Sequence, residues 1–355
     1  LSTETGQEFN RGMVNKKRLS LSLPPAGSPE KSFDEKVKDE QLKAQKIISS
    51  HLEVRHIQNE ARWQTLCDLM KDAVTSLVFT PPKPVTFPKK TNYRAEDAVL
   101  LLSDIQYGKC TPTYNFETAK KRINHIFNSV FEIVDIHRHA YPINNLHIIC
   151  LGDMVDGESI YPTQAHHIDA PLVDQLFLGA PNMVDNLARA ASHFENVYCY
   201  GVPGNHGRLG RFDDEVSNFD RIFYKIIELA TANVGNIHWS ITPKWYDVVK
   251  IMNTQFLAVH GHQIKMTFNL PWYGITTRIS RWATTAQVGN FDAVCMGHFH
   301  VSSNLAWNNK HIFTNGTTIA GDEFALELLG MESSESQWFF GVHPERITWK
   351  YCLGF

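Results

Sequence analysis

The sequence predicts a layered α/β fold with two packed sheets, and the order of its apolar segments carries that prediction. From Ala98 onward, short apolar runs alternate with segments of helical period, which is typical of strands joined by helices. After residue 237 the apolar runs follow one another with few helical segments between them, which indicates a second, strand-rich half. The composition, 43% hydrophobic and 20% charged, is that of an ordinary globular protein.

Periodicity places the individual elements of this body. Apolar runs predict strands at 98–102, 146–151, 197–202, 237–241, 245–251, 255–260, 293–296 and 311–315. Apolar residues spaced by three and four predict helices at 116–139, 172–194, 215–232 and 276–286.

The first 95 residues differ from this body in composition. Residues 1–33 are rich in Ser, Pro, Gly, Lys and Glu, which predicts a flexible arm. Residues 34–79 predict a helical appendage of two helices, from about 35 to 57 and from about 66 to 78. Residues 80–95 are rich in Pro and Lys and predict a stiff extended connector. Residues 96–355 form the main domain.

The helical appendage has too few residues to bury much apolar surface alone. We therefore expect it to pack on the main domain or on another subunit, which makes a homo-oligomer through these helices one interpretation. A small DNA-binding helical unit is the alternative, although Lys and Glu alternate here instead of segregating.

Charge is distributed unevenly along the chain. Residues 1–95 hold 16 Lys and Arg against 11 Asp and Glu, whereas the remaining residues hold 18 against 26. The main domain is therefore acidic, which argues against a broad basic nucleic-acid-binding face.

No apolar stretch is long enough to span a membrane, and the first residues lack an apolar signal segment. The scattered cysteines predict reduced thiols and a cytoplasmic location, in the host cytoplasm if the protein is viral.

Polar residues of metal-ligand type follow five of the predicted strands. These residues are Asp104 and Gln106; Asp153 and Asp156; Asn205, His206 and Arg208; His260 and His262; and His298 and His300. Strands of one sheet end at one edge, so these side chains are expected to converge. Carboxylates, imidazoles and amide oxygens suit Mn²⁺, Fe or Zn²⁺ better than thiolate-bound zinc. The candidates outnumber the ligands of one ion, which favours a two-metal site.

Residues 151–157, Leu-Gly-Asp-Met-Val-Asp-Gly, have several interpretations when taken alone. Asp153 and Asp156 could hold a metal, share a proton or cap the next helix. Gly152 lets the backbone turn sharply beside the first acid. The other four strand ends supply partners and favour the metal.

The motif order Asp-x-Gln, Gly-Asp-x-x-Asp, Gly-Asn-His, His and Gly-His-x-His resembles that of the calcineurin-like metallophosphoesterase superfamily, from about residue 98 to at least residue 300. The resemblance implies a two-sheet β-sandwich flanked by helices, in agreement with the element pattern. It also implies two divalent metal ions, with Mn²⁺ favoured and Fe, Zn²⁺ and Mg²⁺ as alternatives. A metal-activated hydroxide would then attack a phosphate ester in line.

The resemblance implies a role for most of the candidates. The first metal is bound by Asp104 and His300, the second by Asn205, His260 and His298, and Asp153 bridges the two. His206 is expected to face the substrate phosphate and to stabilise or protonate the leaving oxygen. Asp156 is expected to orient the His206 ring.

Position 106 departs from the family pattern, which has His there. Gln106 offers a neutral carbonyl oxygen, a weaker ligand than imidazole. It either binds the first metal, holds a water on that metal, or leaves the first site weak. We expect activity to survive and the first site to be less occupied than the second.

The sequence leaves two interpretations open for several other polar residues. Arg208 either clamps a phosphate or lies on the surface. His262 either faces the site or braces the loop that carries His260. One loop either borders the path of a substrate or has no part in it; its residues are Tyr161, Gln164, His166 and His167.

The residues within and next to the motifs also indicate the class of substrate. Asp156 is followed by Gly157 and Glu158, whereas protein phosphatases usually have Arg-Gly there. The segments Asp-Ile-Gln-Tyr-Gly, Gly-Asn-His-Gly-Arg and Gly-His-Phe-His resemble bacterial and phage phosphoesterases grouped with DNA-repair exonucleases. A phosphodiesterase or nuclease acting on DNA is therefore expected. The alternatives are a phosphatase or phosphodiesterase for small nucleotides and a metal-binding assembly protein with a degenerate site.

Overall fold

The computed structural model describes residues 32–76, 95–161, 164–210, 216–265, 271–320 and 335–355. The chain divides into two units, Leu1–Lys71 and Asp72–Phe355. Nearly all of the predicted arm at 1–33 and of the predicted connector at 80–95 lies outside the described residues, so both stay predictions.

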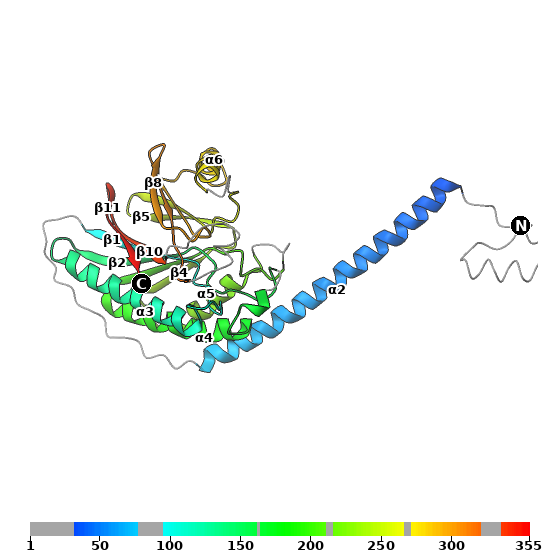
Figure 1. The fold of residues 1–355 in the computed structure, drawn as a ribbon, viewed down its shortest axis with the longest axis horizontal. Helices are drawn as coiled ribbons and strands as arrows, with labels where there is room; N and C mark the ends of the chain where they lie inside the picture. Colours follow the sequence, from blue (N-terminus) through cyan, green and yellow to red (C-terminus); the bar gives the residue numbers. More distant parts are fainter. Residues whose placement is uncertain (1–31, 77–94, 162–163, 211–215, 266–270, 321–334) are drawn as a thin grey trace, which may run out of the picture. The chain divides into compact units, whose positions relative to one another are not determined.

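The first described element is a single helix, α2, which runs from Phe33 to Ser76 (Figure 1). Two helices were predicted here, and that prediction was wrong. Residues 33–76 contain neither Gly nor Pro, so nothing in the backbone interrupts the helix between its two apolar stripes. At its start, the Glu35 N–H donates to Ser32 Oγ at 3.2 Å and the Ser32 N–H donates to Glu35 Oε2 at 2.8 Å, which forms a capping box.

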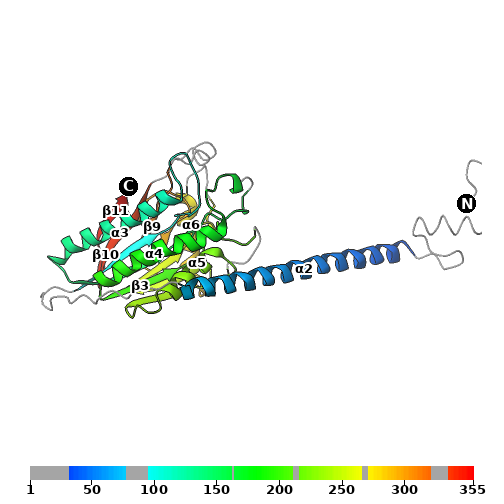
Figure 2. The same cartoon turned by 90° about the horizontal axis from the view of Figure 1, so that it is seen from below.

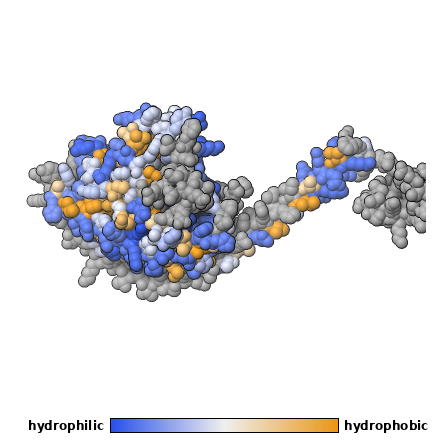
Figure 3. Space-filling model, in the orientation of Figure 1, coloured by the Kyte–Doolittle hydropathy of each residue, from blue (hydrophilic) through white to orange (hydrophobic). Residues whose placement is uncertain are grey.

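Several apolar side chains of α2 are exposed, namely Val37, Leu42, Ile47, Val54 and Ile57. Figure 3 shows such apolar residues as isolated patches among hydrophilic ones on the described part of this helix. Self-association through this helix therefore stays a prediction. In the part of the chain that the structure describes, no helix has the length and apolar character needed to cross a membrane.

The second unit is built on two sheets. The first has the strand order β11-β10-β1-β2-β3-β4. Its strands are β1 (Glu96–Leu102), β2 (Ile143–Cys150), β3 (Asn196–Gly201), β4 (Ile237–Ile241), β10 (Ser336–His343) and β11 (Arg346–Gly354). Strands β1 to β4 are parallel, while β10 runs antiparallel to both β1 and β11.

The second sheet has the strand order β5-β6-β7-β9-β8. Its strands are β5 (Tyr246–Ile251), β6 (Thr254–Val259), β7 (Ala293–Met296), β8 (Ser303–Trp307) and β9 (Lys310–Thr314). The three central strands, β6, β7 and β9, are parallel, and the edge strands β5 and β8 are antiparallel to their neighbours.

Helices cover the outer faces of both sheets (Figures 1 and 2). On the first sheet these are α3 (Phe116–Arg138), α4 (Leu172–His193) and α5 (Phe219–Ala230), and on the second it is α6 (Trp272–Trp282). A short 3-10 turn, η1, spans Gln164–His166. The predicted two-sheet α/β sandwich flanked by helices is therefore confirmed.

The core lies between the two sheets. Every residue of β1 is buried, as expected for a strand with both faces covered. Alternate residues Val99 and Leu101 join the inter-sheet cluster, in which Phe256 and Phe313 of the second sheet meet Phe340 of β10. The packing of the sheets holds the loops at their strand ends in fixed positions, and those loops carry the candidate ligands.

Three strands were not predicted, namely β8, β10 and β11. Strands β8 and β11 lie at sheet edges, where several residues are exposed and no continuous apolar run is needed. The predicted helix at 276–286 begins earlier, at Trp272. The remaining predicted elements appear within a few residues of their expected bounds.

Truncating a core ring between the sheets should destabilise the second unit. Phe256→Ala is expected to lower the free energy of unfolding by about 3–5 kcal/mol, because Phe256 is fully buried and its ring centroid lies 5.8 Å from that of Phe340. Leu229→Ala, at a half-exposed position on α5, serves as the control and should cost less than roughly 0.5 kcal/mol. Chemical denaturation measures both, and equal losses would contradict this assignment of the core.

Candidate metal centre

The loops after β1, β2, β3, β6 and β7 come together at one end of the sandwich. Two backbone hydrogen bonds join the first two loops: the Asp104 N–H donates to the Gly152 carbonyl at 3.1 Å, and the Gln106 N–H donates to the Asp153 carbonyl at 2.9 Å. Side-chain contacts add the other three loops, because His260 meets Asn205 and Asp153 and the His298 N–H donates to Asp104, so the predicted convergence at the carboxyl ends of the strands is observed.

Left-handed backbone is concentrated in these loops. Among the described residues, eight that are not glycine have positive φ, and five of them are candidate ligands: Asp104 (53°), Gln106 (46°), Asp153 (53°), His298 (72°) and His300 (54°). Residues with a side chain rarely adopt this conformation, and it persists only where the surroundings enforce it. The fold therefore fixes the direction in which each of these five side chains leaves the backbone.

Gly152 allows the loops after β2 and β3 to approach closely. It has φ of 89°, and a Cβ there would lie 2.5 Å from the backbone nitrogen of Gly204. A Cβ at Gly204 would in turn lie 2.1 Å from Asp153 Oδ1. Only glycine at both positions lets the Asp153 carboxylate rest against the Gly-Asn-His loop.

One group of ligand atoms surrounds the imidazole of His260, which is fully buried. Its Nδ1 lies 2.7 Å from the Leu151 carbonyl oxygen, to which it donates. Its Nε2 faces two oxygens, Asp153 Oδ2 at 2.9 Å and Asn205 Oδ1 at 2.8 Å. Ligand atoms of Asp153, His260 and His298 all lie within 4.8 Å of one another. The residues expected at the second metal are therefore brought together.

A second group forms around Asp104, which is also fully buried. Its Oδ1 lies 3.3 Å from His300 Nε2, and both carboxylate oxygens accept from the His298 N–H, at 3.2 and 3.0 Å. Gln106 is buried beside them, with its Nε2 3.4 Å from His300 Nε2. A half-turn of this amide would present its oxygen to the His300 ring instead.

His206 lies beside these groups, and its ring contacts Asp156, the residue that was expected to orient it. Its Nδ1 is 3.0 Å from Asp156 Oδ1 and 3.0 Å from the Asp156 carbonyl oxygen, and its backbone N–H donates to Asp153 Oδ1 at 2.8 Å. Burial lowers the pKa of His206, but the charges of Asp153 and Asp156 raise it to about 9. The Nε2 remains 4.0 Å from Asp153 Oδ2.

Asp220 is a residue of this site that the sequence did not reveal. It lies in the first turn of α5 and accepts hydrogen bonds from the backbone of Asp153 at 2.9 Å, Met154 at 2.8 Å and Gly204 at 2.8 Å. Burial and the charge of Asp153 raise its pKa to about 6. Asn218 and Asp220 lie inside the helix predicted at 215–232, and only the fold shows that Asp220 ties two ligand loops together.

The residues for which the sequence left two interpretations open differ in where they lie. Tyr161 lies against His206, with ring centroids 5.0 Å apart, and Gln164 is buried. His166 and His167 are exposed on the same loop. The His262 ring lies 5.6 Å from that of His260 and 6.3 Å from that of His298. Arg208 pairs with Asn218 in an isolated bridge.

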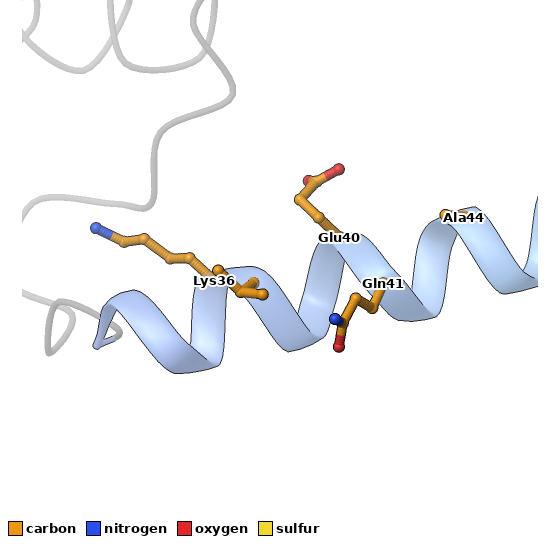
Figure 4. Close-up of a pocket in the computed structure, with 5 residues that line it drawn as sticks. Lys36, Glu40, Gln41 and Ala44 are labelled. Carbon is orange, nitrogen blue, oxygen red and sulfur yellow. The ribbon is translucent and has the colours of Figure 1, made fainter.

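Two hollows are lined by residues other than the candidate ligands. One, of about 410 Å³, is lined by α2 residues alone: Lys36, Val37, Glu40, Gln41 and Ala44 (Figure 4). The other, of about 710 Å³, lies along α3 and α4 and has several amide side chains in its lining, including Asn124, Asn128, Asn182 and Asn186. Neither contains a residue of the ligand groups, so the strand-end site remains the functional candidate.

Comparison with known proteins gives likeness at the level of structure. No family model matches the chain, and no curated protein matches it. Vps29 with bound zinc from Entamoeba histolytica is 12% identical, with a TM-score of 0.35 over 72% of this chain and 92% of that one. A predicted phosphoesterase from Streptococcus pneumoniae is 12% identical, with a TM-score of 0.29 over 71% and 86%. An archaeal phosphodiesterase is 11% identical, with a TM-score of 0.34 over 72% and 99%.

The chain's own features can be set against what the motif resemblance implies. Four of the five motifs match those of the family, in the family's order, and all five follow a strand of a two-sheet sandwich. Their side chains form two adjacent groups of oxygen and nitrogen atoms with an imidazole beside them. The two-sheet sandwich and the gathering of these side chains at its strand ends agree with what the motif resemblance to the calcineurin-like metallophosphoesterase superfamily implies.

Proposed function

We propose that this protein hydrolyses phosphate esters with two divalent metal ions, and that phosphodiesters of DNA are its favoured substrates. The observation that carries the proposal is the position of His206, held at Nδ1 by Asp156 directly beside Asp153 and the ligand groups. An imidazole in that position can act on a phosphate ester whose oxygens are bound by the metals.

The donor set fits divalent ions. His260 donates its Nδ1 proton to the Leu151 carbonyl, so loss of the second ring proton would leave the Nε2 lone pair directed toward Asp153 Oδ2 and Asn205 Oδ1. A cation would then take the place of that proton among three acceptors. Asp153, Asn205, His260 and His298 would hold one ion; Asp104, Gln106, Asp153 and His300 would hold the other.

When bound, the ions would polarise the phosphoryl oxygens and offset the charge that develops on them. The chain's own contribution comes from His206. Asp156 fixes the ring through Nδ1, so Nε2 is the nitrogen free to donate a hydrogen bond or a proton to the leaving oxygen. The raised pKa of His206, to about 9, favours the protonated form that such a donor needs.

Two alternatives rest on particular observations. The acidic balance of residues 96–355, with 18 Lys and Arg against 26 Asp and Glu, opposes tight DNA binding and favours a small-nucleotide substrate. Gln106, in place of the family's His, favours a metal-binding assembly protein with a degenerate first site.

A substrate panel separates these functions. With Mn²⁺, wild-type protein is expected to cleave DNA, and His206→Ala should reduce the rate by roughly 10²–10⁴-fold because the leaving oxygen loses its proton donor. His238→Ala, at an exposed position on β4, is the control and should retain full activity. Turnover of bis-para-nitrophenyl phosphate without DNA cleavage would support the small-substrate alternative. Metal binding with no turnover of any ester would contradict the enzyme proposal.

The two acids of the Gly-Asp-x-x-Asp motif should respond differently to loss of charge. Asp153→Asn is expected to lose metal, because Asp153 Oδ2 lies among the ligand atoms around His260. Asp156→Asn should keep its metal and turn over slowly, because Asp156 contacts the His206 ring instead. Calorimetric titration with Mn²⁺ measures both variants. Loss of metal from both would show that this division of roles is wrong.

Metal affinity should depend on pH. In the metal-free protein burial lowers the pKa of His260, but the charge of Asp153 raises it to about 9, above the ordinary 6.5, so the ring is protonated at neutral pH. This charged form stabilises the metal-free fold below about pH 6.5, and the contribution is lost as pH rises through 9. Mn²⁺ affinity should therefore rise between pH 7 and 9, with protons released on binding. Calorimetry at pH 7.5 in buffers of different ionisation enthalpy counts these protons, and a count of zero would contradict the prediction.

A further inference from the structure

The hydroxyl of Tyr161 is bonded to a candidate metal ligand. Asn205 Nδ2 donates to the Tyr161 hydroxyl oxygen at 2.6 Å, while Asn205 Oδ1 lies 2.8 Å from His260 Nε2 on the opposite side of the amide. Asn205 is buried, whereas Tyr161 remains 44% exposed. The tyrosine therefore spans from the ligand group to solvent.

A count of protons shows what this hydroxyl can still do. With its oxygen turned to the ligand group, the Asn205 amide presents only N–H groups to Tyr161, so the phenol oxygen must accept. The phenol proton is then left to donate elsewhere. Within the described residues, no acceptor takes it, and the Tyr161 ring lies 5.0 Å from the ring of His206. A hydrogen-bond donor is thus available at the Tyr161 hydroxyl, beside Asn205, on a ring that packs against His206.

The position of Tyr161 is set by a buried side chain. Gln164, which is 7% exposed, accepts from the Ile160 N–H at 2.9 Å and from the Tyr161 N–H at 3.2 Å. The same Gln164 amide donates to the Asp156 carbonyl, and Asp156 also holds the His206 ring. Gln164 therefore anchors Tyr161 directly and His206 through Asp156. This arrangement fixes the positions of both donors before a ligand binds.

We propose that Tyr161 is a substrate-binding residue whose hydroxyl donates to a non-bridging oxygen of the phosphoryl group while its oxygen accepts from Asn205. The inference rests on the proposed function, because it assigns a contact within the same site. The ligand it recognises is an anionic tetrahedral oxygen group, as in a phosphate ester or free phosphate. A hydrogen bond to such a charged acceptor is stronger than one between neutral groups.

Tyr161→Phe removes this donor and keeps the ring against His206. We expect Mn²⁺ affinity to be unchanged and the affinity of the Mn²⁺-loaded protein for inorganic phosphate to fall roughly tenfold or more, both measured by calorimetry. The KM for bis-para-nitrophenyl phosphate should rise in parallel. Tyr351→Phe is the matched control and should change neither affinity, because this partly exposed tyrosine also has a bonded hydroxyl, 3.1 Å from His137 Nε2, and belongs to β11.

Unchanged phosphate affinity in Tyr161→Phe would overturn the inference. A fall in Mn²⁺ affinity would also overturn it, since the hydroxyl would then act through Asn205 and not on the phosphate. Failure of the proposed function is separate: wild-type protein that binds phosphate in a Tyr161-dependent way but hydrolyses no ester would retain this contact and lose the enzyme proposal. Wild-type protein that binds no phosphate would overturn the contact itself.

Discussion

The buried carboxylate of Asp153 is the group on which the rest of the site depends. Burial would raise its pKa, but the neighbouring imidazoles of His260 and His206 hold that pKa well below its usual range. The charged acid therefore persists where water is excluded. A buried charge is stable only when it is paired, and here each oxygen has a partner: the His206 N–H at Oδ1 and His260 Nε2 at Oδ2.

The backbone around Asp153 is arranged to hold that charge in place. Asp153 has left-handed backbone, and its N–H donates to Asp220 from α5. Gly152 and Gly204 let two loops meet at distances that no side chain would tolerate. The inter-sheet core then fixes where those loops begin, so strain at the site is balanced by packing elsewhere.

Two histidines of the site, His260 and His206, differ in the groups that their ring nitrogens contact. His260 donates Nδ1 to the Leu151 carbonyl, and its Nε2 points into the ligand group. His206 has Nδ1 held by Asp156, and its Nε2 stands 4.0 Å from Asp153 Oδ2. The two rings thus differ in the partner of Nδ1, which is a carbonyl oxygen alone for His260 and also a carboxylate for His206. Asn205 also has a different partner on each side of its amide. Its Oδ1 faces His260 Nε2, and its Nδ2 donates to the Tyr161 hydroxyl.

The sequence by itself determined the two-sheet α/β architecture and the candidate ligands. Apolar periodicity reveals buried strands and helices, and polar residues after a strand must appear at its end. It did not reveal the edge strands β8 and β11, whose exposed residues need no continuous apolar run, or the unbroken helix α2. Nor did it reveal the contact that Asp220 makes to Asp153 or the bond from Asn205 to Tyr161. Those contacts join residues 67 and 44 positions apart, and only tertiary packing decides which distant groups meet.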